Sequence, residues 1–318
     1  MFRPSSIQGL YDVHNQGLKK VVMHEASRPW GSRSDRFQAP LPVTPLREHI
    51  PEMRSGRWSF APKIDGQRML MVIVADIINM RREKFICLLN RRQEVMLVPG
   101  MSISEFSVGS VLDCELVLIP GQKPVLSVFD CYSFGNKAVT KRTQTDRLKC
   151  VDTLFSSHMS FGEGDPVVLQ TKRFYQLTPG DSDVQARVRG IWNACLQNQP
   201  FEGLPIDGLM LVDMFQAPCP GMCVSQQKMK AHHTIDLQAR HIEGGGTSVG
   251  VIDRYGQVAE LLRIDDDLEE GIWECLLDMN GCTPLKLRPD KSRPNTQYTL
   301  EQTQKTVLEN VTIEDLIA

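Results

Sequence analysis

The sequence has 318 residues, and a single hydrophobic core rarely grows to that size, so we expect two domains. Apolar residues make up 41% of the chain and charged residues 23%, as is ordinary for a globular protein. The formal net charge of -2 excludes a protein that holds nucleic acid by bulk charge alone, but it is compatible with a local basic surface.

Targeting signals are absent from the sequence. No apolar run is long enough to span a bilayer, and the first ten residues lack the basic and apolar regions of a signal peptide. The nine Cys residues are odd in number, and several lie inside apolar runs, which indicates a reducing compartment. We therefore expect an intracellular protein, and these features leave the compartment within the cell open.

The first two thirds of the chain predict a strand-rich domain. Residues 1–58, with prolines at 40, 42, 45 and 51, predict irregular structure with short helices. Short branched-apolar runs bounded by polar or Gly/Pro turns then predict strands over 69–75, 85–89, 111–118, 125–130, 167–170 and 208–212. Apolar spacing predicts helices over 143–157 and 184–197.

The last third has a different pattern. A Gly-rich break at 241–250 suggests a domain edge, and we assign 1–237 to a first domain and 238–318 to a second. Short strands at 258–262 and 272–277 suit a small barrel such as an OB-fold, and a helix is expected over 300–317. Strands and helices in these proportions predict an α+β fold.

The segment A-P-K-I-D-G-Q-R, residues 61–68, carries the first candidate for chemistry. Lys63 is a potential nucleophile if its amine is kept neutral, and burial or neighbouring positive charge lowers the pKa of a lysine. Gly66 allows the backbone to approach a phosphate closely. Lys-x-Asp-Gly is also a common turn, so this segment alone predicts no function.

Two further candidates lie in apolar strands. Asp113 and Glu115 share one strand face in V-L-D-C-E-L-V-L. Buried carboxylates are costly unless they bind a cation or a hydroxyl, although an edge strand facing water would also accept them. Phe129 and Asp130 place an aromatic ring beside an acid, which is equally typical of a core Phe next to a turn.

The remaining candidates are polar groups at strand ends. Asp207 starts the apolar run I-D-G-L-M-L-V, and Lys228 and Lys230 face the same way if K-M-K lies in a strand, as a two-pronged phosphate contact would require. The segment 283–295 gathers five charged residues, namely Lys286, Arg288, Asp290, Lys291 and Arg293.

In this order, the motifs resemble the covalent nucleotidyltransferase superfamily, which contains the polynucleotide ligases and the mRNA capping guanylyltransferases. The closing string R-P-D-K-S-R-P-N looks like the capping branch, as does F-Q-A-P-L-P-V-T-P-L-R at 37–47. The resemblance covers roughly residues 37–300. The chain departs from the usual motif residues at Asn90, Cys114, Met229 and Lys286, none of which removes a group needed for the chemistry.

The resemblance implies an ATP-grasp-like nucleotidyltransferase domain of the ligase and capping type, with antiparallel sheets, followed by an OB-fold β-barrel. It implies an mRNA guanylyltransferase in which Lys63 attacks the α-phosphate of GTP and forms a lysyl-GMP intermediate. The GMP then passes to the 5′-diphosphate end of RNA and forms the GpppN cap. Glu115 and Asp207 resemble the carboxylates that position Mg²⁺ or Mn²⁺.

The same resemblance assigns the nucleotide contacts. Arg68 and Arg91 correspond to phosphate and ribose contacts, and Phe129 to the ring that stacks on guanine. Lys228 and Lys230 would lower the pKa of Lys63 and neutralise the α-phosphate. Arg288, Asp290 and Lys291 would meet the β- and γ-phosphates when the C-terminal domain closes. The implied partners are GTP, 5′-diphosphate RNA and separate triphosphatase and methyltransferase chains, with no membrane.

Other functions use some of the same residues. An ATP-dependent RNA or DNA ligase would use the same Lys63, and an inactive RNA-binding relic of the fold would retain the motifs without the reaction. A zinc site at Cys219, Cys223, His232 and His233 is a further alternative. The intervening Pro-Gly turn and the adjacent histidines argue against it.

Overall fold

The computed structural model describes residues 2–318 except 33–36, 79, 161, 163, 243, 244, 265, 266 and 290. The chain divides into two compact units: residues 1–43, 51–229 and 316–318 form the first, and residues 44–50 and 230–315 form the second. The division between Met229 and Lys230 precedes the expected edge at 237, which falls inside a strand, Thr234–His241. Each unit has its own hydrophobic core.

The larger sheet of the first unit has the strand order β1-β2-β7-β6-β5-β9-β10-β11 within the described residues, and β13 pairs in parallel with β10. The strands are β1 (Phe2–Pro4), β2 (Tyr11–Val13), β5 (Gln67–Ile78), β6 (Arg81–Asn90), β7 (Val95–Val98), β9 (Val111–Val117), β10 (Val125–Phe134), β11 (Lys137–Ala138) and β13 (Val168–Thr171). The expected strands in this region are therefore confirmed.

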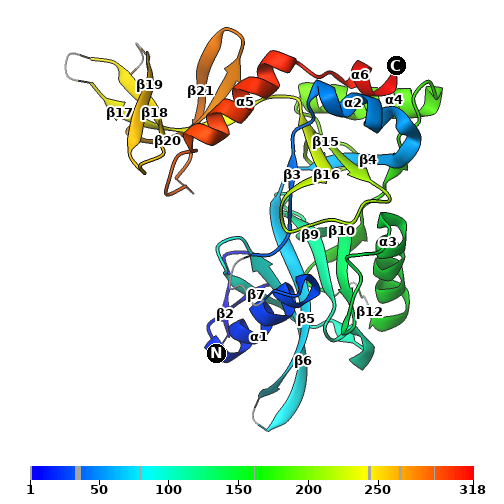
Figure 1. The fold of residues 1–318 in the computed structure, drawn as a ribbon. Coiled ribbons are helices and arrows are strands. Elements are labelled where there is room, and N and C mark those ends of the chain that lie inside the picture. Colours follow the sequence, from blue (N-terminus) through cyan, green and yellow to red (C-terminus); the bar gives the residue numbers. More distant parts are fainter. Residues whose placement is uncertain are drawn as a thin grey trace. The chain divides into compact units, whose positions relative to one another are not determined.

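Helices cover both faces of this sheet. Alternate residues of β5 point to opposite faces: Met69 and Met71 belong to a core shared with α3 (Gln144–Thr153), whereas Leu70 and Val72 belong to a core shared with α1 (Gln16–Ser27). The continuous apolar run of β5 reflects this burial on both faces. Figure 1 shows α1 and α3 on different sides of the sheet.

A second sheet of the first unit carries several candidate residues. Its strand order is β14-β4-β15-β16-β3 in the described part of the chain. The strands are β3 (Pro40–Val43), β4 (Trp58–Ile64), β14 (Tyr175–Gln176), β15 (Ile206–Asp213) and β16 (Gly221–Lys230). Helix α4 (Ser182–Leu196) packs against β15, and a short helix, α2 (Ile50–Glu52), leads into β4. Two short strands, β8 (Ser102–Ile103) and β12 (Met159–Ser160), pair separately.

The second unit is a five-stranded antiparallel sheet in the order β19-β18-β17-β20-β21. Its strands are β17 (Thr234–His241), β18 (Thr247–Ile252), β19 (Val258–Ile264), β20 (Gly271–Asp278) and β21 (Gly281–Leu287). The expected small β-domain is confirmed, although β19 and β21, its two edge strands, are not paired with each other in the described part of the chain. The Gly-rich segment at 241–250 lies inside this unit, where His241 pairs with Thr247 across a hairpin.

The C-terminal helix is interrupted, contrary to the expected single helix over 300–317. Helix α5 (Gln297–Glu309) ends where Asn310 adopts a left-handed conformation with φ of 44°, and α6 (Ile313–Ile317) follows. Asparagine is one of the few residues that tolerates this conformation at a helix end. No helix among the described residues is both long and apolar enough to cross a membrane.

Candidate active site

Lys63 and Asp207 form an ion pair between neighbouring strands of the second sheet. The Nζ atom of Lys63, on β4, lies 2.6 Å from Oδ1 of Asp207, on β15. Because Ile206 pairs with Ile64 and Gly208 pairs with Lys63, Asp207 is the extra residue of a β-bulge. A bulge changes the direction of a side chain, which accounts for the carboxylate facing the lysine. Both side chains are about a quarter exposed, at 26% and 24%.

Gly66 brings the turn after Lys63 close to β9. A Cβ atom at this position would lie 2.5 Å from the carbonyl oxygen of Leu116 and 3.0 Å from Cγ of Glu115. The contact with backbone cannot be relieved by a side-chain rotation. Packing against β9 is therefore sufficient to require glycine in the Lys-x-Asp-Gly motif, and it keeps this turn next to Glu115.

Glu115, on β9, is electrostatically coupled to Lys172, the residue that follows β13. Burial raises the pKa of Glu115 to about 7, although Lys172, Lys63 and Arg68 act in the opposite direction. Burial also lowers the pKa of Lys172 to about 8, against the attraction of Glu115. Both groups therefore titrate near neutral pH, which is typical of functional sites rather than of surface ion pairs.

Phe129 lies between two cations. Its ring centroid is 4.9 Å from Nζ of Lys172 and 5.6 Å from Cζ of Arg68, both within the range of cation–π attraction. The ring is buried, and Phe129 is itself the extra residue of a bulge, because Val128 pairs with Cys114 and Asp130 pairs with Asp113. The bulge thus interrupts the alternation of β10 at the aromatic residue.

Arg68, on β5, is fixed by a side-chain ion pair with Asp113 on the neighbouring strand β9, although its register partner on that strand is Glu115. Nε and Nη2 of Arg68 lie 2.9 and 2.5 Å from the two carboxylate oxygens of Asp113, and Tyr132 donates a further hydrogen bond to that carboxylate. Burial lowers the pKa of Arg68, but Asp113 outweighs this effect and the net pKa is raised. Asp113 therefore positions Arg68. Arg91, directly after β6, is exposed and lies within electrostatic range of Arg68.

Lys228 and Lys230 share one face of β16, as expected. Both side chains are partly exposed, and Met229 between them is buried. Met229 occupies a position where the resembling family usually has an aromatic residue, and here it fills part of the core. The strand therefore presents two ammonium groups on the same side.

The basic segment of the second unit is paired with its own carboxylates. Nη1 of Arg288 lies 3.2 Å from Asp236 and 3.4 Å from Glu274, and Nζ of Lys291 lies 3.1 Å from Asp236. Nζ of Lys286 lies 3.2 Å from Glu274. Asp236 and Glu274 face each other directly across β17 and β20, so these cations relieve a repulsion between like charges. Asp290, expected among the nucleotide contacts, lies outside the described residues.

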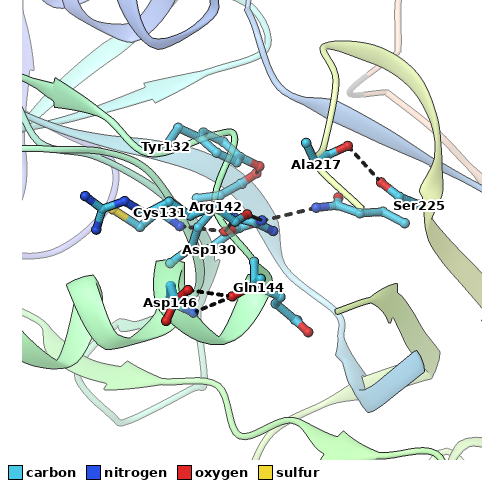
Figure 2. A network of polar contacts seen from close by, with 12 residues as sticks. Asp130, Cys131, Tyr132, Arg142, Gln144, Asp146, Ala217 and Ser225 are labelled. Carbon is cyan, nitrogen blue, oxygen red and sulfur yellow. Dashed lines mark hydrogen bonds and ion pairs between the residues drawn. The ribbon is translucent and has the colours of Figure 1, made fainter. Parts of the chain in front are cut away.

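A polar network ties helix α3 to the strands that carry the candidate residues (Figure 2). Arg147 donates to both carboxylate oxygens of Asp130, at 2.7 and 3.0 Å, and Gln226 of β16 donates to the same carboxylate at 3.2 Å. Ser59 of β4 donates to Gln144 at 2.7 Å. The network therefore joins the strands of Phe129, Lys228 and Lys63.

One candidate residue was missing from the motif list. Lys172 was not predicted, because Q-T-K-R-F contains no recognisable motif; the available signal was a cation directly after the expected strand at 167–170. For the suggested zinc ligands Cys219, Cys223, His232 and His233, the described residues contain no group of three or more His, Cys, Asp or Glu side chains able to hold a metal ion.

The fold and this cluster define a nucleotidyltransferase domain followed by a small β-domain. The chain belongs to the mRNA capping enzyme family: the family's catalytic-domain model matches residues 4–180, and its C-terminal-domain model matches residues 214–317. The two matches together cover most of the chain.

Individual proteins and solved structures resemble this chain at low sequence identity. The mRNA-capping enzyme subunit alpha of Neurospora crassa is 26% identical over 147 residues, which is 40% of this chain and 36% of that protein, so the match spans little more than a third of the curated relative. A mycobacterial DNA ligase D complexed with ATP and MES is similar at 17% identity over 80% of this chain and 96% of that one, with a TM-score of 0.45. The ligase domain from M. tuberculosis LigD is similar at 18% identity over 73% and 74%, with a TM-score of 0.39.

Proposed function

We propose that the chain is an mRNA guanylyltransferase that transfers GMP from GTP to the 5′-diphosphate end of RNA. The observation that carries this proposal is the 2.6 Å pair of Lys63 and Asp207, next to the coupled Glu115 and Lys172. Lys63 is partly exposed, is oriented by a carboxylate and has buried charges near it. These surroundings are more typical of a nucleophile than of a lysine in a surface ion pair. Membership of the capping family supports the same reading.

The reaction has two balanced steps. In the first, the neutral Nζ of Lys63 attacks the α-phosphorus of GTP, the bond to the pyrophosphate oxygen breaks, and Nζ releases one proton to solvent, so that lysyl-GMP and pyrophosphate result. In the second, a terminal phosphate oxygen of the RNA attacks the same phosphorus. The N–P bond then breaks, Lys63 recovers its proton, and GpppN is released.

The groups around Lys63 have separate tasks. The ion pair with Asp207 orients Nζ, and the ammonium must lose its proton before it can attack. Lys228 and Lys230 are suited to neutralise charge that develops on the α-phosphate. Arg288 and Lys291, with Asp290 between them in the sequence, are suited to the β- and γ-phosphates, which requires them to leave their carboxylate partners.

Glu115 and Asp207 are the residues that would hold a divalent cation. Their oxygen donors suit Mg²⁺ or Mn²⁺, since such ions are commonly held by one or two carboxylates together with substrate phosphates. A cation bound there supplies positive charge to the phosphate oxygens. The fit rests on the chemistry of the two carboxylates, one paired with the nucleophile and the other electrostatically coupled to it.

Selection of guanine over adenine is assigned to Phe129 and Lys172. Stacking on an aromatic ring accepts either purine, so the choice must come from the base edge. A lysine ammonium only donates hydrogen bonds, and guanine offers O6 and N7 as acceptors where adenine places an amino donor at the position of O6. Lys172, 4.9 Å from the ring centroid, is placed to make this distinction.

The steps before and after guanylyl transfer are proposed to belong to separate triphosphatase and methyltransferase chains. The Neurospora relative is named as a subunit alpha, which supports assembly with a partner. By this function the chain would act in the nucleus if it is cellular, and in the cytoplasm or virion if it is viral.

The test is the mass of the protein after incubation with GTP and Mg²⁺. One GMP adduct is expected on the wild type and on Lys20→Ala, whose lysine lies exposed on α1, but none on Lys63→Ala. An adduct on Lys63→Ala would overturn the assignment of the nucleophile. Labelling by ATP as efficient as labelling by GTP would favour a ligase, and a wild-type protein with no adduct from either nucleotide would favour an inactive relic.

A further inference from the structure

A cavity of about 850 Å³ lies in the first unit. Three segments line it: the short 3₁₀ helix Glu105–Ser107, the turn after β10, and one side of α3, which packs against β10 (Figure 1). The described lining residues include none of those assigned to guanylyl transfer. The cavity is therefore a second concave surface of the unit, and its side chains indicate what it can bind.

An exposed aromatic ring forms part of the cavity wall. Phe106 is 70% exposed, yet its ring is stacked on the imidazole of His158, with the centroids 5.3 Å apart and the planes 11° from parallel. His158 is held in place, because its Nδ1 lies 3.2 Å from Oγ of Ser104 and its carbonyl oxygen accepts hydrogen bonds from Ser104 and Ser107. Phe106 lines the cavity and His158 does not. The imidazole thus supports a ring that is fixed and open to solvent.

Basic side chains line the other walls of the cavity. Asp146, Lys149 and Thr153 follow one another at intervals of three and four residues, so they share one face of α3, and Arg142 precedes that helix. Lys137 contributes from the turn after β10, and all three cations are exposed. Among the described residues, neither Lys137 nor Arg142 forms an ion pair. Their positive charge is therefore available to a ligand.

The two carboxylates of the cavity do not cancel this charge. Asp146 is paired with Lys149 on the same helix, at 3.3 Å. Glu105 is paired with Arg82, which lies on β6 outside the cavity wall. When Arg82 is counted with the three lining cations, four positive charges stand against two negative ones. The surroundings of the cavity thus carry a net positive charge and favour an anionic ligand.

We propose that this cavity binds a single-stranded segment of RNA, with a base stacked on Phe106 and phosphates against Lys137 and Arg142. An aromatic surface beside basic groups is the means by which proteins hold single-stranded nucleic acid without reading its sequence. A duplex does not fit this mode, because its bases are already stacked on one another. An acidic peptide would use the cations but does not require the fixed ring. The inference rests on the proposed function for the identity of the RNA, which is the chain that receives GMP.

The position of the cavity predicts which part of the RNA it holds. Phe129, in the nucleotide cluster, and Phe134, in the cavity wall, are five residues apart on β10. A strand rises about 3.3 Å per residue, so the two rings belong to positions roughly 16 Å apart. An RNA whose 5′ end lies at Lys63 therefore reaches the cavity only with nucleotides several positions downstream. The site would hold the body of the RNA chain while its end reacts.

The experiment measures binding of a fluorescein-labelled, twelve-nucleotide single-stranded RNA to the full chain by fluorescence anisotropy. The RNA has a 5′-hydroxyl end, so it is no substrate and its binding is independent of guanylyl transfer. Phe106→Ala should raise the Kd by roughly five- to fiftyfold through the loss of one stacked base, and Phe106→Trp should retain the affinity. Lys137→Gln and Arg142→Gln should each reduce the slope of log affinity against log salt concentration by about 0.7, the contribution of one phosphate contact.

Two matched variants serve as controls and should bind like the wild type: Phe215→Ala, at another exposed ring of the same unit, and Lys20→Gln, at an exposed lysine of α1. Wild-type RNA affinity in both Phe106→Ala and Lys137→Gln would overturn the proposal.

A protein partner is the other outcome that would overturn it. If Lys137→Gln weakens binding of a phosphorylated acidic peptide but not of RNA, the cavity belongs to such a partner. If Phe106→Ala does not fold, the salt slopes of Lys137→Gln and Arg142→Gln decide the question, together with ultraviolet crosslinking, which should attach the RNA to the peptide that contains Phe106. A protein that binds RNA at this cavity but forms no GMP adduct would contradict the guanylyl transfer alone.

Discussion

The two units of the molecule have opposite balances of basic and acidic residues. The first unit has 26 Lys and Arg residues against 21 Asp and Glu, whereas the second has 10 against 17. Nucleic acid binding is dominated by contacts between cations and phosphates. The net charge of -2 for the whole chain is the sum of these two opposite charge balances. If the proposed function holds, the net positive charge of the first unit makes that unit the better suited of the two to contact RNA phosphates.

The cations that are proposed to contact the nucleotide also differ in their surroundings between the two units. In the first unit, Lys172 and Arg68 are buried or nearly so and lie against an aromatic ring. In the second, Arg288 and Lys291 are more exposed and rest on Asp236. Permanent burial suits groups that act throughout the reaction, whereas a displaceable ion pair suits groups needed only while the triphosphate is bound. The following predictions test this division of labour.

The largest effect is expected from the carboxylates of the first unit. Glu115→Gln and Asp207→Asn should slow both adduct formation and transfer to RNA, each by on the order of 10³ or more. The reason is that, in the proposed mechanism, the same two carboxylates would hold the divalent cation that stabilises charge on the phosphate oxygens in both steps. The rates are measured separately, by single-turnover labelling with GTP and by adding 5′-diphosphate RNA to isolated adduct. Glu83→Gln, a matched change at an exposed carboxylate of β6 outside the motifs, is the control. Loss of only one half-reaction would contradict a shared role.

The second unit should instead affect one half-reaction. In the proposed mechanism, Arg288→Ala or Lys291→Ala removes a contact to the β- and γ-phosphates, which leave as pyrophosphate before RNA is used. Adduct formation should fall by on the order of 10²–10³, whereas transfer from preformed adduct should change much less. Arg263→Ala, in the same unit and paired with exposed Glu260 at 2.9 Å, is the control. Equal slowing of both steps by Arg288→Ala would show that this segment is not specific to the triphosphate.

The choice of base should depend on pH through Lys172. Its pKa is lowered to about 8, so the ammonium that favours guanine is lost as the pH rises through that value. The preference for GTP over ATP should fall by roughly tenfold between pH 7 and pH 9, in line with the loss of one or two kcal/mol of discrimination by a base-edge contact. Lys172→Met should show the low preference at both pH values. A preference that Lys172→Met leaves intact would exclude this residue from base selection.

Sequence patterns predicted the strands of the first unit well because those strands are long, apolar and buried, as β5 and β10 show. They could not predict the bulges at Asp207 and Phe129, since a bulge is a property of pairing between strands distant in sequence. The motif residues were therefore found by resemblance, and the reason for their orientation became visible only in the structure.

Other features of the structure that differ from the expectations, or that were not predicted, each depend on one or two residues. The Gly-rich segment at 241–250 contains the residues of both a linker and a hairpin turn, and only the pairing of His241 with Thr247 distinguishes the two. The interruption of the last helix depends on one residue, Asn310, in a sequence whose apolar spacing continues on both sides. Lys172 and Asp236 carry charges whose partners, Glu115 and Arg288, lie more than fifty residues away.

The smallest expected effect concerns the carboxylates that hold the basic segment. Asp236 and Glu274 face each other across two strands, and Lys286, Arg288 and Lys291 neutralise them. If Arg288 must leave these acids to reach the triphosphate, Glu274→Gln weakens the competing pair and should lower the KM for GTP by about two- to fivefold, the range of a partly exposed ion pair. The gain should shrink at high salt, because salt screens exposed charges. Glu260→Gln, which removes an exposed carboxylate of the same unit, should leave the KM unchanged. A raised KM in Glu274→Gln would instead mean that the carboxylates hold Arg288 ready for the phosphate, and the second unit would then share the fixed, preorganised character of the first.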